Sequence, residues 1–191
     1  MSGALAYNDY EFYEPHEIIN GKIYMMSSPS VNHIRINSDI DTIFKNYLNG
    51  KTCEAFINPN VYFSNEDHFI PDEIIVCNPE IIGENSINGA PDLVVEILSK
   101  STAKNDKTEK LFKYGKYGVK EYWIVNPWDK SVEVYLLKNG ELKIDNVYQL
   151  LTEREFNDLT KLQKSIITSE IKVSIYDDFI VKLEDIFRRV K

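Results

Sequence analysis

The sequence predicts one α+β domain, built on a mixed central sheet that is flanked by helices. Apolar residues recur at helical spacing in two segments, 29–49 and 102–117. Short apolar runs bounded by Pro, Gly and Asn indicate buried strands, and two Asn-Gly pairs indicate hairpins. A chain of 191 residues suits a single domain, whose core we expect over about residues 10–137, with a C-terminal extension over 138–191.

The first predicted elements are a hairpin and a helix. Asn20-Gly21 joins two short apolar runs, and a type I′ turn at this pair requires a positive φ at both positions. Such a turn places Glu17 opposite Tyr24. A helix then follows the cap residue Ser28 and ends near residue 49.

Strands, a second helix and a mostly helical tail follow. The predicted strands are CEAFI (53–57), VYFS (61–64), PDEIIVC (71–77), APDLVVEILS (90–99) and GVKEYWIVNP (118–127). The helix over 102–117 is expected to turn Leu111, Phe112 and Gly115 toward the core. After a hairpin around Asn139-Gly140, the charged tail is predicted to be helical except for a strand near residues 171–175.

Composition points to a protein of the cytoplasm. Cys53 and Cys77 are too few and too isolated for a disulfide framework, so we expect reduced thiols. The first 17 residues have neither a basic flank nor an apolar run, so they do not resemble a signal peptide. No stretch approaches the roughly 18 apolar residues of a membrane span, so no membrane partner is expected.

The charge balance bears on nucleic acid as a partner. A net charge of −8 opposes bulk attraction to nucleic acid, although a local basic patch or bound divalent cations can reverse the field. Residues 100–120 form such an exception, because they hold seven lysines against two acids. The alternative is that these lysines only line a solvated helix face.

Two acidic side chains interrupt an apolar strand. Asp92 and Glu96 stand four positions apart, so on a strand they project from the same face. Asp72 follows a proline in the earlier strand, as Asp92 does here. A hard divalent cation such as Mg²⁺ or Mn²⁺ would relieve their repulsion and would suit metal-assisted attack on a phosphodiester. The alternative is structural: Asp92 caps its strand and Glu96 forms a buried ion pair.

A cationic side chain would complete such a site. Lys110 lies beside the inward face of the second helix and can stabilise charge on a phosphate or orient a water. Lys107 is the second choice. His33, one turn into the first helix, is either a packing residue or a contact to phosphate.

The combined pattern resembles the PD-(D/E)XK superfamily, which has the restriction-endonuclease-like fold. Within it, the chain resembles a bacterial family of predicted restriction endonucleases whose function is mostly unassigned. The matching segments are HEIINGKIYMMSSPSVNH (16–33), PDEIIVC (71–77), PDLVVEILSKST (91–102) and DKTEKLFKYGKYGVKEYWIVNP (106–127).

This resemblance implies roles for individual residues. Asp72 matches the acid of the PD strand and Glu96 the central acid of the motif, with Asp92 as an additional acid at the same site. Two residues after Glu96 stands Leu98 where the motif has lysine. Related proteins often carry the lysine on the following helix, which indicates Lys110.

Glu17, on a hairpin within the matching pattern, is a further candidate acid near the metal. The implied protein is a Mg²⁺- or Mn²⁺-dependent endonuclease acting on DNA, for which a homodimer would suit a double-strand cut. One alternative is a catalytically inactive module of the same fold that binds nucleic acid or protein. Another is a metal-free hydrolase that uses paired acids.

Overall fold

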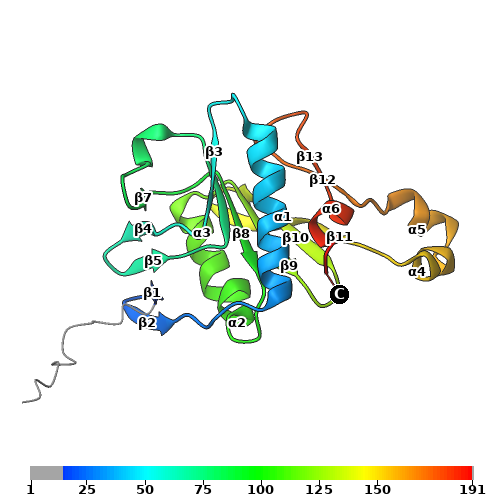
Figure 1. Cartoon of the computed structure of the whole chain (residues 1–191), viewed down its shortest axis with the longest axis horizontal. Coiled ribbons are helices and arrows are strands. Elements are labelled where there is room, and N and C mark those ends of the chain that lie inside the picture. Colours follow the sequence, from blue (N-terminus) through cyan, green and yellow to red (C-terminus); the bar gives the residue numbers. More distant parts are fainter. Residues whose placement is uncertain (1–14, 191) are drawn as a thin grey trace, which may run out of the picture.

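The computed structural model describes residues 15–190 and confirms the α+β fold with a mixed central sheet (Figure 1). Residues 1–14 and 191 lie outside the described part. Two expectations therefore fall wholly or partly outside the described residues. One is that the first 17 residues do not resemble a signal peptide, and the other is that the core begins near residue 10. No helix of the described residues is both long enough and apolar enough to cross a bilayer.

Six strands of the described chain form the central sheet. Only β8 and β9 run parallel, and the other neighbouring pairs are antiparallel. In spatial order, β11-β10-β9-β8-β6-β3, the strands are Glu141–Gln149, Ser131–Lys138, Glu121–Asn126, Leu93–Ile97, Glu73–Val76 and Glu54–Ile57.

A second sheet and a short strand pair complete the β structure within residues 15–190. The second sheet has the order β2-β1-β5-β4-β7, and its members are Lys22–Met25, His16–Ile19, Asp67–Phe69, Val61–Ser64 and Ile87–Asn88. The predicted hairpin is confirmed, because Glu17 lies opposite Tyr24 and the turn residues Asn20 and Gly21 have φ values of 53° and 72°. The strand pair is β12 (Glu170–Lys172) with β13 (Ile180–Lys182).

The helices lie on both faces of the central sheet and in the C-terminal extension. The long helix is α1 (Val31–Leu48), and a 3-10 turn, η1, covers Pro79–Ile81. A continuous helical segment then combines α2, the π-helical η2 and α3: Ala103–Asn105, Asp106–Lys110 and Leu111–Tyr117. The extension contributes α4, α5 and α6: Glu153–Asp158, Lys161–Ile166 and Leu183–Phe187.

Two hydrophobic cores sandwich the central sheet. One core joins the sheet to α1, α6 and the β12–β13 pair, and it contains the edge-on contact of Phe44 with Trp123. The other joins the opposite face of the sheet to α3 and the second sheet. Alternation along β6 places Ile75 in the first core and both Ile74 and Val76 in the second.

Three predictions about helices need correction. The tail, expected to be mostly helical with one strand near residues 171–175, contains two paired strands, β12 and β13. Helix α1 begins at Val31, because Ser30 rather than Ser28 is its N-cap and accepts a hydrogen bond from the His33 backbone N–H. Phe112, expected to pack inward, is 66% exposed. Residues two positions apart on a helix differ by about 200° around its axis, so a helix that buries Lys110 turns Phe112 to solvent.

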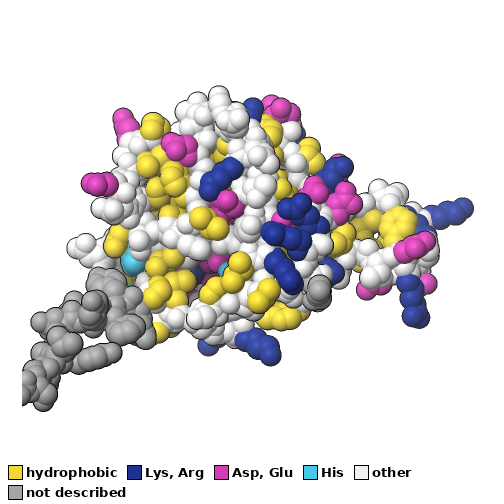
Figure 2. All heavy atoms as spheres, in the orientation of Figure 1, with side chains coloured by type: hydrophobic (Ala, Val, Ile, Leu, Met, Phe, Trp, Pro, Cys, Tyr) yellow, Lys and Arg dark blue, Asp and Glu magenta, His cyan; other side chains and the backbone are white. Residues whose placement is uncertain are grey.

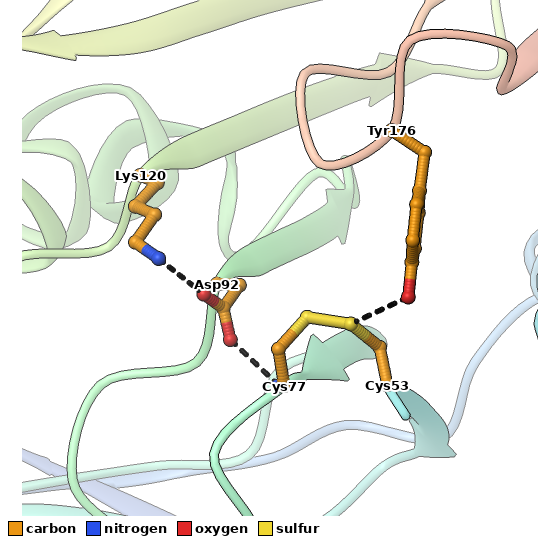
Figure 3. The surroundings of a disulfide bond; sticks show 5 residues. All are labelled: Cys53, Cys77, Asp92, Lys120 and Tyr176. Atoms are coloured by element: carbon orange, nitrogen blue, oxygen red, sulfur yellow. Dashed lines mark hydrogen bonds and ion pairs between the residues drawn. A yellow bond between two sulfur atoms is a disulfide. The ribbon is translucent and has the colours of Figure 1, made fainter. Parts of the chain in front are cut away.

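The expectation of two reduced thiols is wrong, because Cys53 and Cys77 form a disulfide (Figure 3). Strands β3 and β6 pair antiparallel with Glu54 opposite Val76, so the next pair outward brings the two cysteines face to face. Their Cα atoms are 4.0 Å apart although 24 positions separate them in the chain. Because the cysteines are far apart in the sequence, the sequence alone does not show that they lie opposite each other on paired strands.

Candidate functional site

Asp72 and Glu96 meet across two neighbouring strands. Strands β6 and β8 are antiparallel with Glu73 opposite Val95, and the same register continued by one pair puts Asp72 opposite Glu96. Residues directly opposite each other in such a ladder have Cβ atoms about 4.5–5.5 Å apart. The backbone N–H of Ile97 also donates to Asp72 Oδ2 at 2.6 Å. The sheet therefore brings two of the three expected acids together at one end.

Lys110 supplies the positive charge of this acid cluster. Its Nζ lies 2.9 Å from Glu96 Oε1 and 2.7 Å from Glu17 Oε1, and 3.5 Å from Asp106 Oδ1. The side chain is 3% exposed. The Tyr114 hydroxyl donates a second hydrogen bond to Glu96 Oε1 at 2.7 Å. The structure thus brings together Glu17, Glu96 and the lysine expected to face them.

The helical segment sends its lysines in different directions. Lys107 Nζ pairs with Glu133 Oε1 on β10 at 2.5 Å, and its side chain is 41% exposed. Lys113 is buried and pairs with Asp67 Oδ2 at 2.7 Å. Lys107, the second choice for the site, therefore points away from the acids. Of these three lysines, Lys110 alone contacts Glu96.

Burial sets the electrostatics of the cluster. It raises the pKa of Glu96 well above its usual range, although Lys110 opposes this, and it also raises the pKa of Asp106. Burial by itself would lower the pKa of Lys110, but the surrounding carboxylates raise that pKa well above its usual value. Lys110 is thus charged at neutral pH. Because several carboxylates share one ammonium group, the cluster favours an additional cation nearby.

His33 reaches the same end of the sheet from the first turn of α1. Its Nε2 lies 2.6 Å from Asp72 Oδ1, so both carboxylate oxygens of Asp72 have partners. The two side chains are 14% and 13% exposed, whereas that of Glu96 is 6% exposed. The cluster is therefore most accessible to solvent at Asp72 and His33.

Glu17 enters the cluster from the second sheet. Its Oε1 contacts Lys110 and also accepts a hydrogen bond from the Ile70 backbone N–H at 2.9 Å. The turn of the same hairpin is anchored where the Asn20 backbone N–H donates to Asp67 Oδ1 at 3.0 Å. These contacts fix the hairpin over Lys110. The carboxylate of Glu17 thus contacts Lys110 and the Ile70 backbone at the same time.

Asp92 lies at the opposite end of β8 and does not join Asp72 and Glu96. Figure 3 shows its carboxylate between Lys120 Nζ and the Cys77 backbone N–H, each at 2.7 Å. Four steps of about 3.3 Å along a strand separate two side chains by roughly 13 Å even when they share a face. The expected convergence of all three acids is therefore not what the structure shows.

Two groups beside the site were not singled out from the sequence. Asp106 is buried, and neither of its carboxylate oxygens has a hydrogen-bond partner among residues 15–190. Its position four residues before Lys110 was a usable signal for an ion pair on one helix face. The buried pair of Asp67 and Lys113 carried no such signal, because it joins β5 to α3 across the fold.

The donors at this end of the sheet suit a hard divalent cation. Mg²⁺ typically takes one or two carboxylates and fills its remaining positions with water and phosphate. Asp72 and Glu96 offer two neighbouring carboxyl groups, and buried Asp106, whose carboxylate oxygens have no hydrogen-bond partner among the described residues, adds a third acidic side chain near Lys110. Within the described chain, however, no group of three His, Cys, Asp or Glu side chains is arranged to hold a metal by itself.

The chain is similar to known proteins in both sequence and structure. The family model described as "Uma2: Putative restriction endonuclease" matches residues 7–168. Two Synechocystis proteins are similar. "Uncharacterized protein slr1290" is 30% identical over 126 residues, which cover 64% of this chain. The match covers 66% of that protein, so this chain spans just under two thirds of its length. "Uncharacterized protein sll1609" is 26% identical over 145 residues, which cover 73% and 78%.

One solved structure shares the fold over nearly the whole chain. It is described as a "putative nuclease belonging to DUF820" from Anabaena variabilis, and it matches with a TM-score of 0.70. The match covers 92% of this chain and 90% of that one at 20% identity, so it shows the fold alone. Because the family model spans most of the chain, the protein belongs to the Uma2 family, described as "Putative restriction endonuclease", as its motifs indicated.

Proposed function

We propose that the protein is a metal-dependent endonuclease that hydrolyses phosphodiester bonds in DNA, with Mg²⁺ or Mn²⁺ as its cofactor. The observation that supports this most is the meeting of Asp72 and Glu96 across β6 and β8, with the Lys110 ammonium 2.9 Å from Glu96. Membership of the Uma2 family supports the same class of reaction. The proposal places the action in the cytoplasm, where DNA is available, although the Cys53–Cys77 disulfide removes the reduced-thiol argument for that compartment.

The proposal gives each residue of the cluster a task. Asp72 and Glu96 would hold the metal ion, which when bound lowers the pKa of a water and polarises a phosphoryl oxygen. Lys110 places a fixed positive charge beside Glu96, where it stabilises charge that builds on the phosphate or orients the attacking water. Glu17 and Asp106 are positioning residues, because they hold the ammonium group of Lys110.

His33 acts on the exposed side of the cluster in this proposal. Its ring nitrogen at 2.6 Å fixes the orientation of the Asp72 carboxylate, whose other oxygen is held by the Ile97 backbone. With 14% of its side chain exposed, His33 can also contact a phosphate that approaches from solvent. DNA would therefore enter beside the first turn of α1.

Cleavage of a supercoiled plasmid tests the proposal. The wild-type protein should nick or linearise the plasmid in Mg²⁺ or Mn²⁺ and should stop when EDTA is added. Asp72→Asn and Glu96→Gln should each lower the rate by roughly 100-fold or more, because each removes a negatively charged oxygen ligand of the metal ion. The measurement is the initial rate of plasmid conversion on a gel.

Asp92→Asn is the matched control, since it changes the same functional group at the other end of β8. It should retain cleavage within a few-fold of wild type, because Asp92 pairs with Lys120 and the Cys77 backbone. Equal loss in Asp92→Asn and Glu96→Gln would overturn the site assignment. Cleavage that survives EDTA would instead favour a metal-free hydrolase.

A second candidate is a catalytically inactive module of the same fold that binds nucleic acid or protein. One observation favours it: the site acids already have cationic or histidine partners, Lys110 for Glu96 and His33 for Asp72. Such a module would bind DNA equally well with and without EDTA and would cleave it under neither condition. Binding measured by fluorescence anisotropy alongside the cleavage assay separates the two functions.

A further inference from the structure

The disulfide borders a surface cavity at the end of β8 that lies away from the candidate metal site. This cavity has a volume of about 330 Å³. Sites for small molecules have volumes of roughly 300–1,000 Å³, so the cavity has room for a small ligand. Its lining comes from both cysteines, from Asp92 with Lys120, and from the turn between β12 and β13: Ser174, Ile175 and Tyr176. A small molecule from solvent can therefore reach the disulfide.

The two cysteines differ in how accessible they are. Cys53 is 5% exposed, whereas Cys77 is only half-buried. The backbone N–H of Cys77 donates to Asp92 Oδ2 at 2.7 Å, which holds this residue beside the cavity (Figure 3). Which sulfur of a disulfide is attacked depends on access. The exposures therefore favour attack on Cys77 Sγ, with the sulfur of Cys53 as the leaving group.

Tyr176 stands where that leaving group needs a hydrogen-bond donor. Its hydroxyl donates to Cys53 Sγ at 3.2 Å (Figure 3). The Tyr176 ring packs edge-on against Tyr47 of α1, with ring centroids 5.6 Å apart, and Lys51 Nζ lies 5.2 Å from its centroid. Hydrogen bonds to a charged acceptor are stronger than those to a neutral one. The contact therefore strengthens when negative charge develops on Cys53 Sγ.

The charges around the cavity allow an anion to approach. Lys120 Nζ lies 2.7 Å from Asp92 Oδ1, so its ammonium group offsets a carboxylate that would repel an incoming thiolate. The Lys120 side chain is 68% exposed. At this end of the molecule, at the top of Figure 2, acidic, basic and hydrophobic side chains lie next to one another. An anionic thiolate thus meets no uniformly acidic surface there.

We propose that the cavity is a thiol-exchange site, in which a small thiol forms a mixed disulfide with Cys77. The thiolate of the incoming molecule attacks Cys77 Sγ and forms a new sulfur–sulfur bond. The Cys53–Cys77 bond breaks, its electron pair leaves on Cys53 Sγ, and the proton of the thiol passes to solvent. The proposal does not depend on the nuclease assignment, because the cavity and the candidate metal site lie at opposite ends of β8.

The mixed disulfide has two fates in this proposal. The pairing of β3 with β6 keeps the Cα atoms of the two cysteines 4.0 Å apart, so the Cys53 thiolate can attack Cys77 Sγ again and release the small thiol. Alternatively, a second thiol attacks the sulfur of the first. The two small thiols are then oxidised to their own disulfide, and Cys53 and Cys77 are reduced to thiols.

Reduction of the folded wild-type protein by dithiothreitol tests the proposal. Free thiols are alkylated at timed intervals and counted by mass spectrometry. The rate should rise in proportion to the dithiothreitol concentration and change little in urea below the unfolding transition, because the folded protein reacts. A rate that rises with urea as steeply as the unfolding equilibrium constant would overturn the proposal, since only the unfolded chain would then react.

Tyr176→Phe tests the stabilisation of the leaving group. Loss of the hydroxyl should slow reduction of the folded protein by roughly 10-fold. Tyr24→Phe, the same change on β2 in the second sheet, should react as the wild type does. In urea concentrated enough to unfold them, all three proteins should react equally, because the hydrogen bond is then absent. Equal rates of folded wild type and Tyr176→Phe would overturn Cys53 as the leaving group.

Single cysteine variants test which sulfur receives the thiol. Oxidised glutathione should add to Cys77 in Cys53→Ser several-fold faster than to Cys53 in Cys77→Ser, because Cys77 is the more accessible residue. Mass spectrometry measures the addition, and circular dichroism verifies that both variants are folded. The wild-type kinetics test the proposal without these variants. Faster or equal addition to Cys53 in the folded variants would overturn the assignment of Cys77.

Discussion

The ammonium group of Lys110 is a deeply buried charge held by several carboxylates. Its side chain is 3% exposed, and an unpaired charge at such depth would cost several kcal/mol. The carboxylates of Glu96 and Glu17 offset that cost at distances of 2.9 and 2.7 Å. The same contacts that make burial tolerable also fix the position of Lys110 beside the candidate metal ligands.

Glu73 makes stability depend on pH. It is fully buried in β6, neither of its oxygens has a hydrogen-bond partner in the described chain, and burial raises its pKa from 4.5 to about 9. Between these values the unfolded chain releases a proton that the folded protein keeps. The free energy of unfolding should therefore fall as pH rises from about 4.5 to about 9, by up to roughly 1.4 kcal/mol per pH unit.

Urea unfolding from pH 5 to pH 9 measures this slope. Glu73→Gln should flatten it, because glutamine does not titrate. Glu54→Gln, which changes an exposed side chain on neighbouring β3, should leave the slope as in wild type. An unchanged slope in Glu73→Gln would show that another group carries the pH dependence.

At the residue scale, the sequence predicted which face of a strand or helix a side chain occupies better than it predicted how far apart two side chains lie. Asp72, Glu96 and Lys110 were named from their places on two strands and a helix, and the structure brings them together. Asp92 was named because it shares a strand face with Glu96, but a shared face says nothing of the separation along the strand. The pairing of β6 with β8, which sequence periodicity does not reveal, decides which acids meet.

Among the elements, the helical segment after β8 shows how one buried residue determines which way its neighbours on the helix point. Once Lys110 turns inward, Tyr114 follows it one turn later and reaches the same Glu96 oxygen. Phe112 must then face solvent, although hydrophobicity predicted the reverse. The π-helical turn over Asp106–Lys110 is the kind of irregularity that often accompanies functional sites.

The disulfide between the ends of β3 and β6 should stabilise the fold without affecting the candidate site. It closes a loop of 24 positions, for which chain entropy predicts about 3 kcal/mol. Reduction with dithiothreitol should lower the free energy of unfolding by about this amount, as measured in urea. Plasmid cleavage should continue at an unchanged rate, because the disulfide lies beside Asp92 at the other end of β8.

The double variant Cys53→Ser with Cys77→Ser is the control for this measurement. Its stability should match that of the reduced wild type and should not respond to dithiothreitol. Equal stability of the oxidised and reduced wild type would contradict the expected contribution of the disulfide.

For the whole molecule, two cores on opposite faces of one sheet explain where the site lies. Helix α1, the segment that includes α3, and the hairpin of β1 and β2 converge at the end of the sheet where β6 begins and β8 ends. The sequence predicted the α+β class because its longer elements have clear periodicity. It did not predict the second sheet, since β5 and β7 have only three and two residues and depend on long-range pairing.

Calorimetric titration with Mn²⁺ tests most directly whether Asp72 and Glu96 share one cation. The wild type and Asp92→Asn should bind the ion with similar affinity, whereas Asp72→Asn and Glu96→Gln should lose measurable binding. Absence of binding by the wild type, or loss of binding in Asp92→Asn but not in Glu96→Gln, would contradict the proposed metal site.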